Sequence, residues 1–247
     1  PKICTVIIAI AISLTTNIIP HVTTSYIRKD YDEVNRRFNQ AISTMLIITV
    51  PMALLLLMLS NESYYIFYGS SKYGSLALKV SAISHIFFGV WTVINTCLQS
   101  MRKFKIVYIN SVAGLLANAL LDIPLILLFN KVGLPEYIAT IVSTCIGYSI
   151  SISIALIYLR KEMHFSYRKT IDLMKKLIVP SIAIIVPILL SKAFIKFDYT
   201  FISSAISLMI HGILGVIIYL TIVYKNNAIN ETLGNEFIDK LLVKLRL

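Results

Sequence analysis

The chain has 247 residues, of which 57% are hydrophobic and only 14% are charged. Soluble domains are usually about 45–50% apolar and about 25% charged, so the composition excludes an ordinary soluble domain. The net charge of +11 is high enough for a nucleic-acid-binding protein. However, the basic residues lie in short loops between apolar runs, as in membrane proteins, so no nucleic-acid partner is expected.

Seven apolar runs follow one another along the chain, each close to or above the ~18–20 residues needed to cross a bilayer. They cover residues 3–20, 41–59, 76–98, 106–129, 137–159, 177–194 and 201–224. Helix is the only reasonable structure for such runs, because lipid offers no partner for backbone groups. We therefore predict an all-α polytopic membrane protein with about seven transmembrane helices.

The runs divide the chain into four regions. We predict a five-helix transmembrane bundle over 1–159, a basic cytoplasmic loop over 160–176, two terminal transmembrane helices within 177–224, and a cytoplasmic tail over 225–247. In the tail, Leu233, Phe237, Leu241 and Leu245 recur every four residues, which indicates an amphipathic helix on the inner leaflet. The chain begins at Pro1 and enters an apolar run at once, so we expect it to be the C-terminal part of a longer protein.

Basic residues alternate between loops. Most of the 23 Lys and Arg residues fall in segments 28–37, 102–105, 160–176 and 225–246, whereas the intervening loops are poor in them. Because cytoplasmic loops carry the excess of Lys and Arg, we expect a multi-pass protein of the cytoplasmic membrane with a cytoplasmic C-terminus.

Two helices carry polar stripes. The first contains Ser13, Thr16, Asn17 and Thr24 around Pro20, and the third contains His85, Thr92 and Gln99 along one face. Polar groups are costly in lipid, so we predict that these seven residues line a water-filled cavity. Ordinary interhelical hydrogen bonding, worth only ~0.6 kcal/mol on average, remains an alternative for each stripe, and His85 taken singly reads as structural.

The fifth run has a stripe of small residues at every fourth position: Ala139, Ser143, Gly147, Ser151 and Ala155. Such a stripe lets a neighbouring helix approach closely, so we interpret it as packing.

Asp122 is the one acidic residue well inside an apolar run. Asn118 lies four residues before it, so both side chains share a helix face. Pro124 follows and leaves a nearby carbonyl without its helical partner. Carboxylate, amide and carbonyl oxygens are ligands that small cations prefer. Asp122 is thus a candidate cation ligand or proton carrier, with a neutral, hydrogen-bonded Asp as the alternative.

No enzyme constellation is apparent. The sequence contains no carboxylate pair, Ser-His-Asp set or Gly-rich phosphate loop. The three cysteines lie in apolar runs without metal or redox spacing, and we interpret them as packing residues. No cofactor is expected, apart from coupling to Na⁺ or H⁺.

The order of features resembles the multidrug, oligosaccharidyl-lipid and polysaccharide (MOP) exporter superfamily. Residues 17–59, beginning NIIPHVTTSYIRKD, resemble its eighth and ninth helices, and IFYG follows at their outer end. Residues 97–126, beginning CLQSMRKFK, resemble the junction of its tenth and eleventh helices, and residues 131–150, beginning KVGLPEY, the start of the twelfth. The branch is that of the lipid II flippase MurJ and stage V sporulation protein B.

The resemblance implies helices eight to fourteen of a fourteen-helix protein. It implies a cation site at Asn118, Asp122 and Thr140. In such fourteen-helix flippases this site is completed by the seventh helix, which this chain lacks. The resemblance also implies a groove for the lipid tail formed by 177–194 and 201–224. The branch usually places an Arg in its eighth helix to meet a pyrophosphate. Because the chain has no Arg between Ile3 and Tyr26, another polyprenyl-linked glycan stays open as substrate.

These features lead us to expect a flippase that moves a polyprenyl-linked oligosaccharide by alternating access, with membrane lipid, that glycan and a missing N-terminal lobe as partners. Three alternatives remain: a cation-coupled multidrug antiporter, a membrane glycan polymerase or ligase, and a receptor-like seven-helix protein. The polymerase class usually needs a large outer loop with catalytic residues. The longest outer loop here, 60–75, offers only Glu62 and Lys72.

Overall fold

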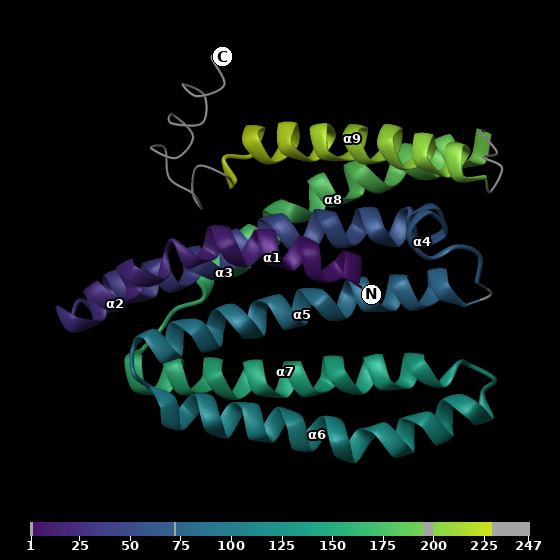
Figure 1. Ribbon diagram of the computed structural model, residues 1–247. Helices are drawn as coiled ribbons and strands as arrows, with labels where there is room; N and C mark the ends of the chain where they lie inside the picture. The colour runs from purple at the N-terminus through teal and green to yellow at the C-terminus, as the bar shows by residue number, and fades with distance from the viewer. Residues whose placement is uncertain (1, 72, 195–199, 229–247) are drawn as a thin grey trace.

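The computed structural model describes residues 2–71, 73–194 and 200–228, which form helices and no strand (Figure 1). In this part of the chain the helices are α1 Lys2–Thr16, α2 Ile19–Ile27, α3 Tyr31–Met58, α4 Ser60–Tyr68, α5 Gly74–Ser100, α6 Phe104–Lys131, α7 Glu136–Met163, α8 Arg168–Phe194 and α9 Phe201–Lys225. Seven segments are long and apolar enough to cross a membrane, with α1 and α2 forming one of them. The predicted all-α, seven-span fold is confirmed.

The long helices lie side by side as a slab (Figure 1). The contacts run from α9 to α8, then to α3, α5, α7 and finally α6, while α1 packs against α3 and α5. α3 is the most buried of the seven spans and α6 the least. Exposed side chains on α6 include Leu115, Leu116, Leu120, Ile123 and Leu127. α6 is thus an edge element whose apolar surface suits lipid or further protein.

The first span departs from the single continuous run expected over 3–20. α1 ends at Thr16, the backbone turns through a bond from Ile18 N to Thr15 O of 2.9 Å, and α2 continues to Ile27. The cause is Pro20, which has no N–H to donate to the carbonyl of Thr16 and whose ring would clash with it.

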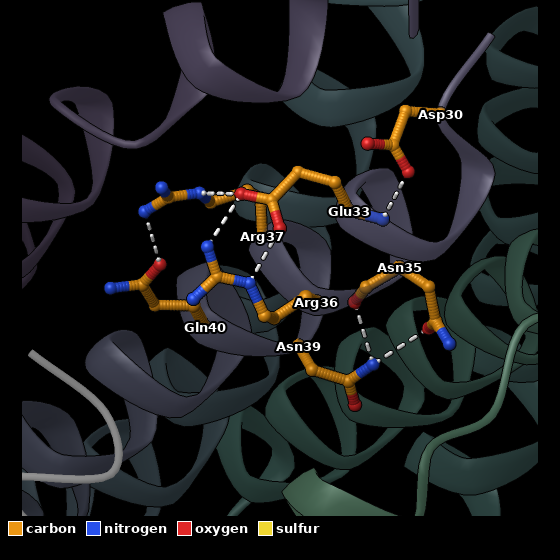
Figure 2. Close-up of polar contacts among 7 residues, drawn as sticks. All are labelled: Asp30, Glu33, Asn35, Arg36, Arg37, Asn39 and Gln40. Atoms are coloured by element: carbon orange, nitrogen blue, oxygen red, sulfur yellow. Dashed lines mark hydrogen bonds and ion pairs between the residues drawn. The ribbon is translucent and has the colours of Figure 1, made fainter. Parts of the chain in front are cut away.

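The cytoplasmic end of α3, in the predicted orientation, is built by its own first turns (Figure 2). The Asp30 carboxylate caps the helix by accepting from Glu33 N at 3.0 Å. Glu33 pairs with Arg36 at 2.6 Å and with Arg37 at 2.7 Å. These contacts extend the helix ten residues before the apolar run begins at Ala41, because acidic residues favour a helix N-terminus.

An inner junction joins the α7–α8 link to α3. The Asn39 amide, 3% exposed, donates to the Ser166 carbonyl at 2.9 Å and accepts from the Thr170 hydroxyl at 2.7 Å. The Phe38 and Phe165 rings meet edge to face at 5.4 Å. Burial raises the pKa of Tyr167 to about 12, and its hydroxyl donates to the Leu156 carbonyl of α7 at 2.7 Å. The inner junction therefore fixes where α8 begins.

An outer junction holds the other end of α8. Lys192 Nζ lies 2.7 Å from Glu62 Oε1 and donates to the Met58 carbonyl at 2.6 Å. Glu62 is 6% exposed, so the pair is largely removed from solvent. Met58 ends α3 where the chain turns into α4, so Lys192 also satisfies a carbonyl released at the end of α3.

The turns rich in Lys and Arg gather at one end of the slab. The α2–α3, α5–α6 and α7–α8 connections and the end of α9 lie at the left in Figure 1, opposite the α4–α5 and α6–α7 connections. Helices extend past the apolar runs into the predicted loop 160–176, so that residues 164–167 alone link α7 to α8. The predicted amphipathic helix of the tail falls largely on residues 229–247, which lie outside the described residues.

Candidate cation site between α6 and α7

The candidate site depends on how closely α6 and α7 approach each other. A Cβ added at Gly147 would lie 2.7 Å from the Gly114 carbonyl oxygen, and a Cβ at Gly114 would lie 2.7 Å from the Gly147 carbonyl oxygen. All five members of the small-residue stripe on α7 are buried, as the packing interpretation requires. Two glycines facing each other thus bring the polar side chains of the two helices within hydrogen-bond reach.

Asp122 and Asn118 converge on α7. The Ser143 hydroxyl lies within hydrogen-bond reach of Asp122 Oδ1, and it lies 3.2 Å from Asn118 Oδ1 and 2.9 Å from the Thr140 carbonyl oxygen. Asn118 Nδ2 donates to the Thr144 hydroxyl at 3.2 Å. One hydroxyl hydrogen cannot serve three acceptors at once, so this cluster has more oxygen lone pairs than protons to fill them. That is the chemistry of a site for a small cation or a proton.

Thr140 takes part differently from the prediction. Its side chain is exposed on α7, and its carbonyl oxygen is the atom that accepts from Ser143 and Thr144. Ser143 and Thr144, which were not among the predicted residues, belong to the same cluster of side chains. Ser143 was assigned to packing because it belongs to the small-residue stripe, although a serine in such a stripe also carries a hydroxyl to the helix crossing.

The face of α6 that carries Asn118 and Asp122 continues toward the start of the helix with a second set of hydrogen-bonded side chains. Asn110, Gly114, Asn118 and Asp122 recur every four residues, a signal visible in the sequence that extends two turns beyond the predicted pair. Asn110 bonds to Asn95 at 3.0 Å, and its Oδ1 accepts from Ser151 at 3.2 Å. Trp91 Nε1 donates to Ser151 at 2.8 Å. A cavity of about 390 Å³ lies beside these side chains, between α5, α6 and α7.

The polar stripe of the first span, which we predicted to line a cavity, is exposed. Ser13, Thr16, Asn17 and Thr24 are exposed, and the two threonine hydroxyls bond back to carbonyls of their own helix. The stripe therefore faces away from the described helices.

The stripe on α5 is only half-buried and makes local contacts. His85 Nδ1 lies 2.7 Å from the Ser81 carbonyl oxygen, the Thr92 hydroxyl donates to the Phe88 carbonyl at 2.8 Å, and Gln99 is exposed. The structure does not bring the α5 stripe to Asp122, and the assignment of either stripe to a cavity stays a prediction.

Comparison with known proteins decides the family. The model of the MurJ family, lipid II flippase MurJ, matches residues 5–209. The chain belongs to the MurJ lipid II flippase family. The predicted resemblance to the MurJ branch of the MOP superfamily is thereby confirmed, and with it a multi-pass membrane protein related to flippases.

Two MurJ proteins show how much of the family's length is present. The chain is 25% identical over 242 residues to the lipid II flippase MurJ of Bacillus subtilis (strain 168), and this covers 94% of the chain and 43% of that protein. A solved structure of lipid II flippase MurJ in an inward closed conformation matches with a TM-score of 0.68 at 19% identity. That match covers 88% of the chain and 43% of the solved one, and at this identity it supports the fold alone. The chain thus spans less than half the length of the MurJ proteins that it matches.

Proposed function

We propose that the chain is the C-terminal part of a flippase that carries a polyprenyl-linked oligosaccharide, a cell-wall or polysaccharide precursor, across the cytoplasmic membrane. The observation that carries this proposal is the MurJ family match over residues 5–209. The protein acts as a transporter rather than an enzyme. Its partners are membrane lipid, the lipid-linked precursor and an N-terminal lobe that lies outside this chain.

Alternating access needs two lobes that move about a central site. The exposed polar stripe on α1 and α2 supports a wet surface that a second lobe would face. The lipid portion would follow the outer surface of α8 and α9, where apolar side chains such as Leu189 and Ile213 are exposed.

A cation or proton at the Asp122 cluster supplies the energetic bias. Such an ion shifts the balance of two conformations only through its differential affinity for them. Because the Ser143 hydroxyl of α7 contacts both Asp122 and Asn118 of α6, a change in the α6–α7 crossing alters the coordination directly. We assign Na⁺ or H⁺ to this role, with Asn118, Asp122 and the Thr140 carbonyl as ligands, joined by Ser143.

The test uses the full-length protein and Asp122→Asn. A ligand that binds only the folded form raises the melting temperature through a stabilisation of RT ln(1 + [L]/Kd). We expect sodium to raise the melting temperature of the parent, Asp122→Asn to abolish this rise along with transport, and Ser143→Ala to weaken it. Asp172→Asn, on the exposed start of α8, is the matched control and should keep the sodium response. A parent protein that responds to neither sodium nor pH would eliminate the coupling role of Asp122.

The orientation has its own test. Since the turns rich in Lys and Arg lie at one end of the slab, a reporter fused after Leu247 should be cytoplasmic. A tag at Ser70, in the connection at the other end, should be labelled by an impermeant reagent in intact cells. Protection of the Ser70 tag would reverse the proposed orientation.

A further inference from the structure

The outer end of the slab, in the proposed orientation, contains a concave pocket that plays no part in the cation site. It has a volume of about 330 Å³ and lies between α4, the start of α5 and the loop that joins them. The described side chains that line it are uncharged: Asn61, Tyr64, Tyr65, Ser70, Ser71 and Ser75.

The pocket has a firm frame. The Tyr64 ring rests on the bare backbone of Gly74, where any Cβ would collide with it, and stacks obliquely on Tyr68 at 5.0 Å. Gly69 ends α4 with a φ of 79°, and its N–H bonds to the Tyr65 carbonyl at 3.0 Å. Tyr137 of α7 donates its hydroxyl to the Tyr73 carbonyl at 3.0 Å. The Tyr64 ring is therefore held in place before any ligand arrives.

The chemistry of the lining is specific. Tyrosine rings present an apolar face and a polar tip, and serine hydroxyls and an amide both donate and accept hydrogen bonds. A pyranose ring presents the complement, with a face of C–H groups and a rim of hydroxyls. Among the described residues that line it, none carries a charge to hold a phosphate or a carboxylate, in contrast to the pocket at the opposite end, where Arg36, Arg168 and Asp172 are among the lining residues.

We propose that this outer pocket binds a neutral saccharide. In the whole protein it would receive the sugar portion of the lipid-linked precursor on the outer side of the membrane, and this use rests on the proposed function. The alternative is an aromatic belt, in which tyrosines at the membrane surface contact lipid headgroups and select no sugar. Tyr65, half-buried within a concave surface together with serines, is the residue that separates the two explanations.

The experiment is saturation-transfer NMR on the full-length protein in detergent, with N,N′-diacetylchitobiose as a neutral disaccharide probe. We expect transfer to the sugar protons in the parent and a loss of affinity of about threefold to tenfold in Tyr65→Ala, the range set by one aromatic contact. Tyr65→Phe keeps the ring face and should bind nearly as well as the parent. Tyr224→Ala removes an exposed tyrosine near the opposite end and is the matched control.

Absence of transfer in the folded parent would overturn the proposal, as would equal transfer in the parent and Tyr65→Ala. The second result, combined with weaker membrane insertion of Tyr65→Ala, would identify an aromatic belt. Because the sugar is soluble and no transport is measured, failure here leaves the Asp122 result standing. Binding of the sugar without any sodium response would instead separate this pocket from the coupling mechanism.

Discussion

Replacing Lys192 by Met is expected to destabilise the protein by about 3–5 kcal/mol, the typical cost of removing one partner of a buried ion pair. The ammonium group pairs with a Glu62 carboxylate whose side chain is only 7% exposed, and the second carboxylate oxygen has no hydrogen-bond partner among the described residues. Without Lys192 this carboxylate would remain buried and unpaired. The Met58 carbonyl would lose its donor as well.

The free energy of unfolding in an SDS titration measures this effect. Because much of the loss comes from the stranded charge, the double variant Lys192→Met with Glu62→Leu should recover a large part of it. Arg168→Met is the comparison, since Arg168 faces Asp172 at 3.9 Å with a side chain 89% exposed, and it should change stability little. Equal effects of Lys192→Met and Arg168→Met would contradict a buried outer junction.

Gly147→Ala should be strongly destabilising although it adds only one methyl group. Its new Cβ would lie 2.7 Å from the Gly114 carbonyl oxygen and 3.1 Å from Cβ of Asn118, so a backbone must move. Overpacking of this kind costs about 1–3 kcal/mol. Because α6 would shift away from α7, the contacts of Ser143 with Asn118 and Asp122 should loosen, and the sodium-dependent rise in melting temperature should shrink in parallel.

Gly212→Ala supplies a control within the same protein. A Cβ at Gly212 meets no atom of the described residues within 4 Å, and the residue is also in a helix, so alanine should stabilise by about 0.5–1 kcal/mol through its helix propensity. The two substitutions add the same methyl group, and the prediction is that they change stability with opposite sign. Gly147→Ala that left both stability and the sodium response unchanged would refute the close α6–α7 crossing.

The sequence correctly predicted the features that depend on a single helix. Hydropathy located all seven spans, because crossing the membrane depends on length and composition. Four-residue spacing placed Asn118 and Asp122 on one face of α6. It did not reveal that Ser143, rather than the Thr140 side chain, meets them, since that depends on the rotation of α7 about its axis, which the facing glycines determine.

Contacts between residues far apart in the sequence could not be predicted, because they also depend on how the helices pack. Lys192 and Glu62 belong to different helices, and no local pattern pairs them. Trp91 and Ser151 are 60 residues apart, and their bond exists only because α5 packs on α7. The break after Thr16 was within reach of the sequence, since Pro20 prevents the helical bond that would have continued α1.

The inner junction has a consequence for synthesis at the ribosome. The Asn39 amide is hydrogen-bonded to Ser166 and Thr170, which lie 127 and 131 residues later in the chain. Until that stretch is translated, a nascent chain with five spans already inserted has an Asn39 amide that is bonded to Asn35 of its own helix but not yet to the α7–α8 link. Release of the chain before Thr170 would therefore leave α3 without the contacts that join it to the α7–α8 link, and the product would differ from the finished bundle at this junction.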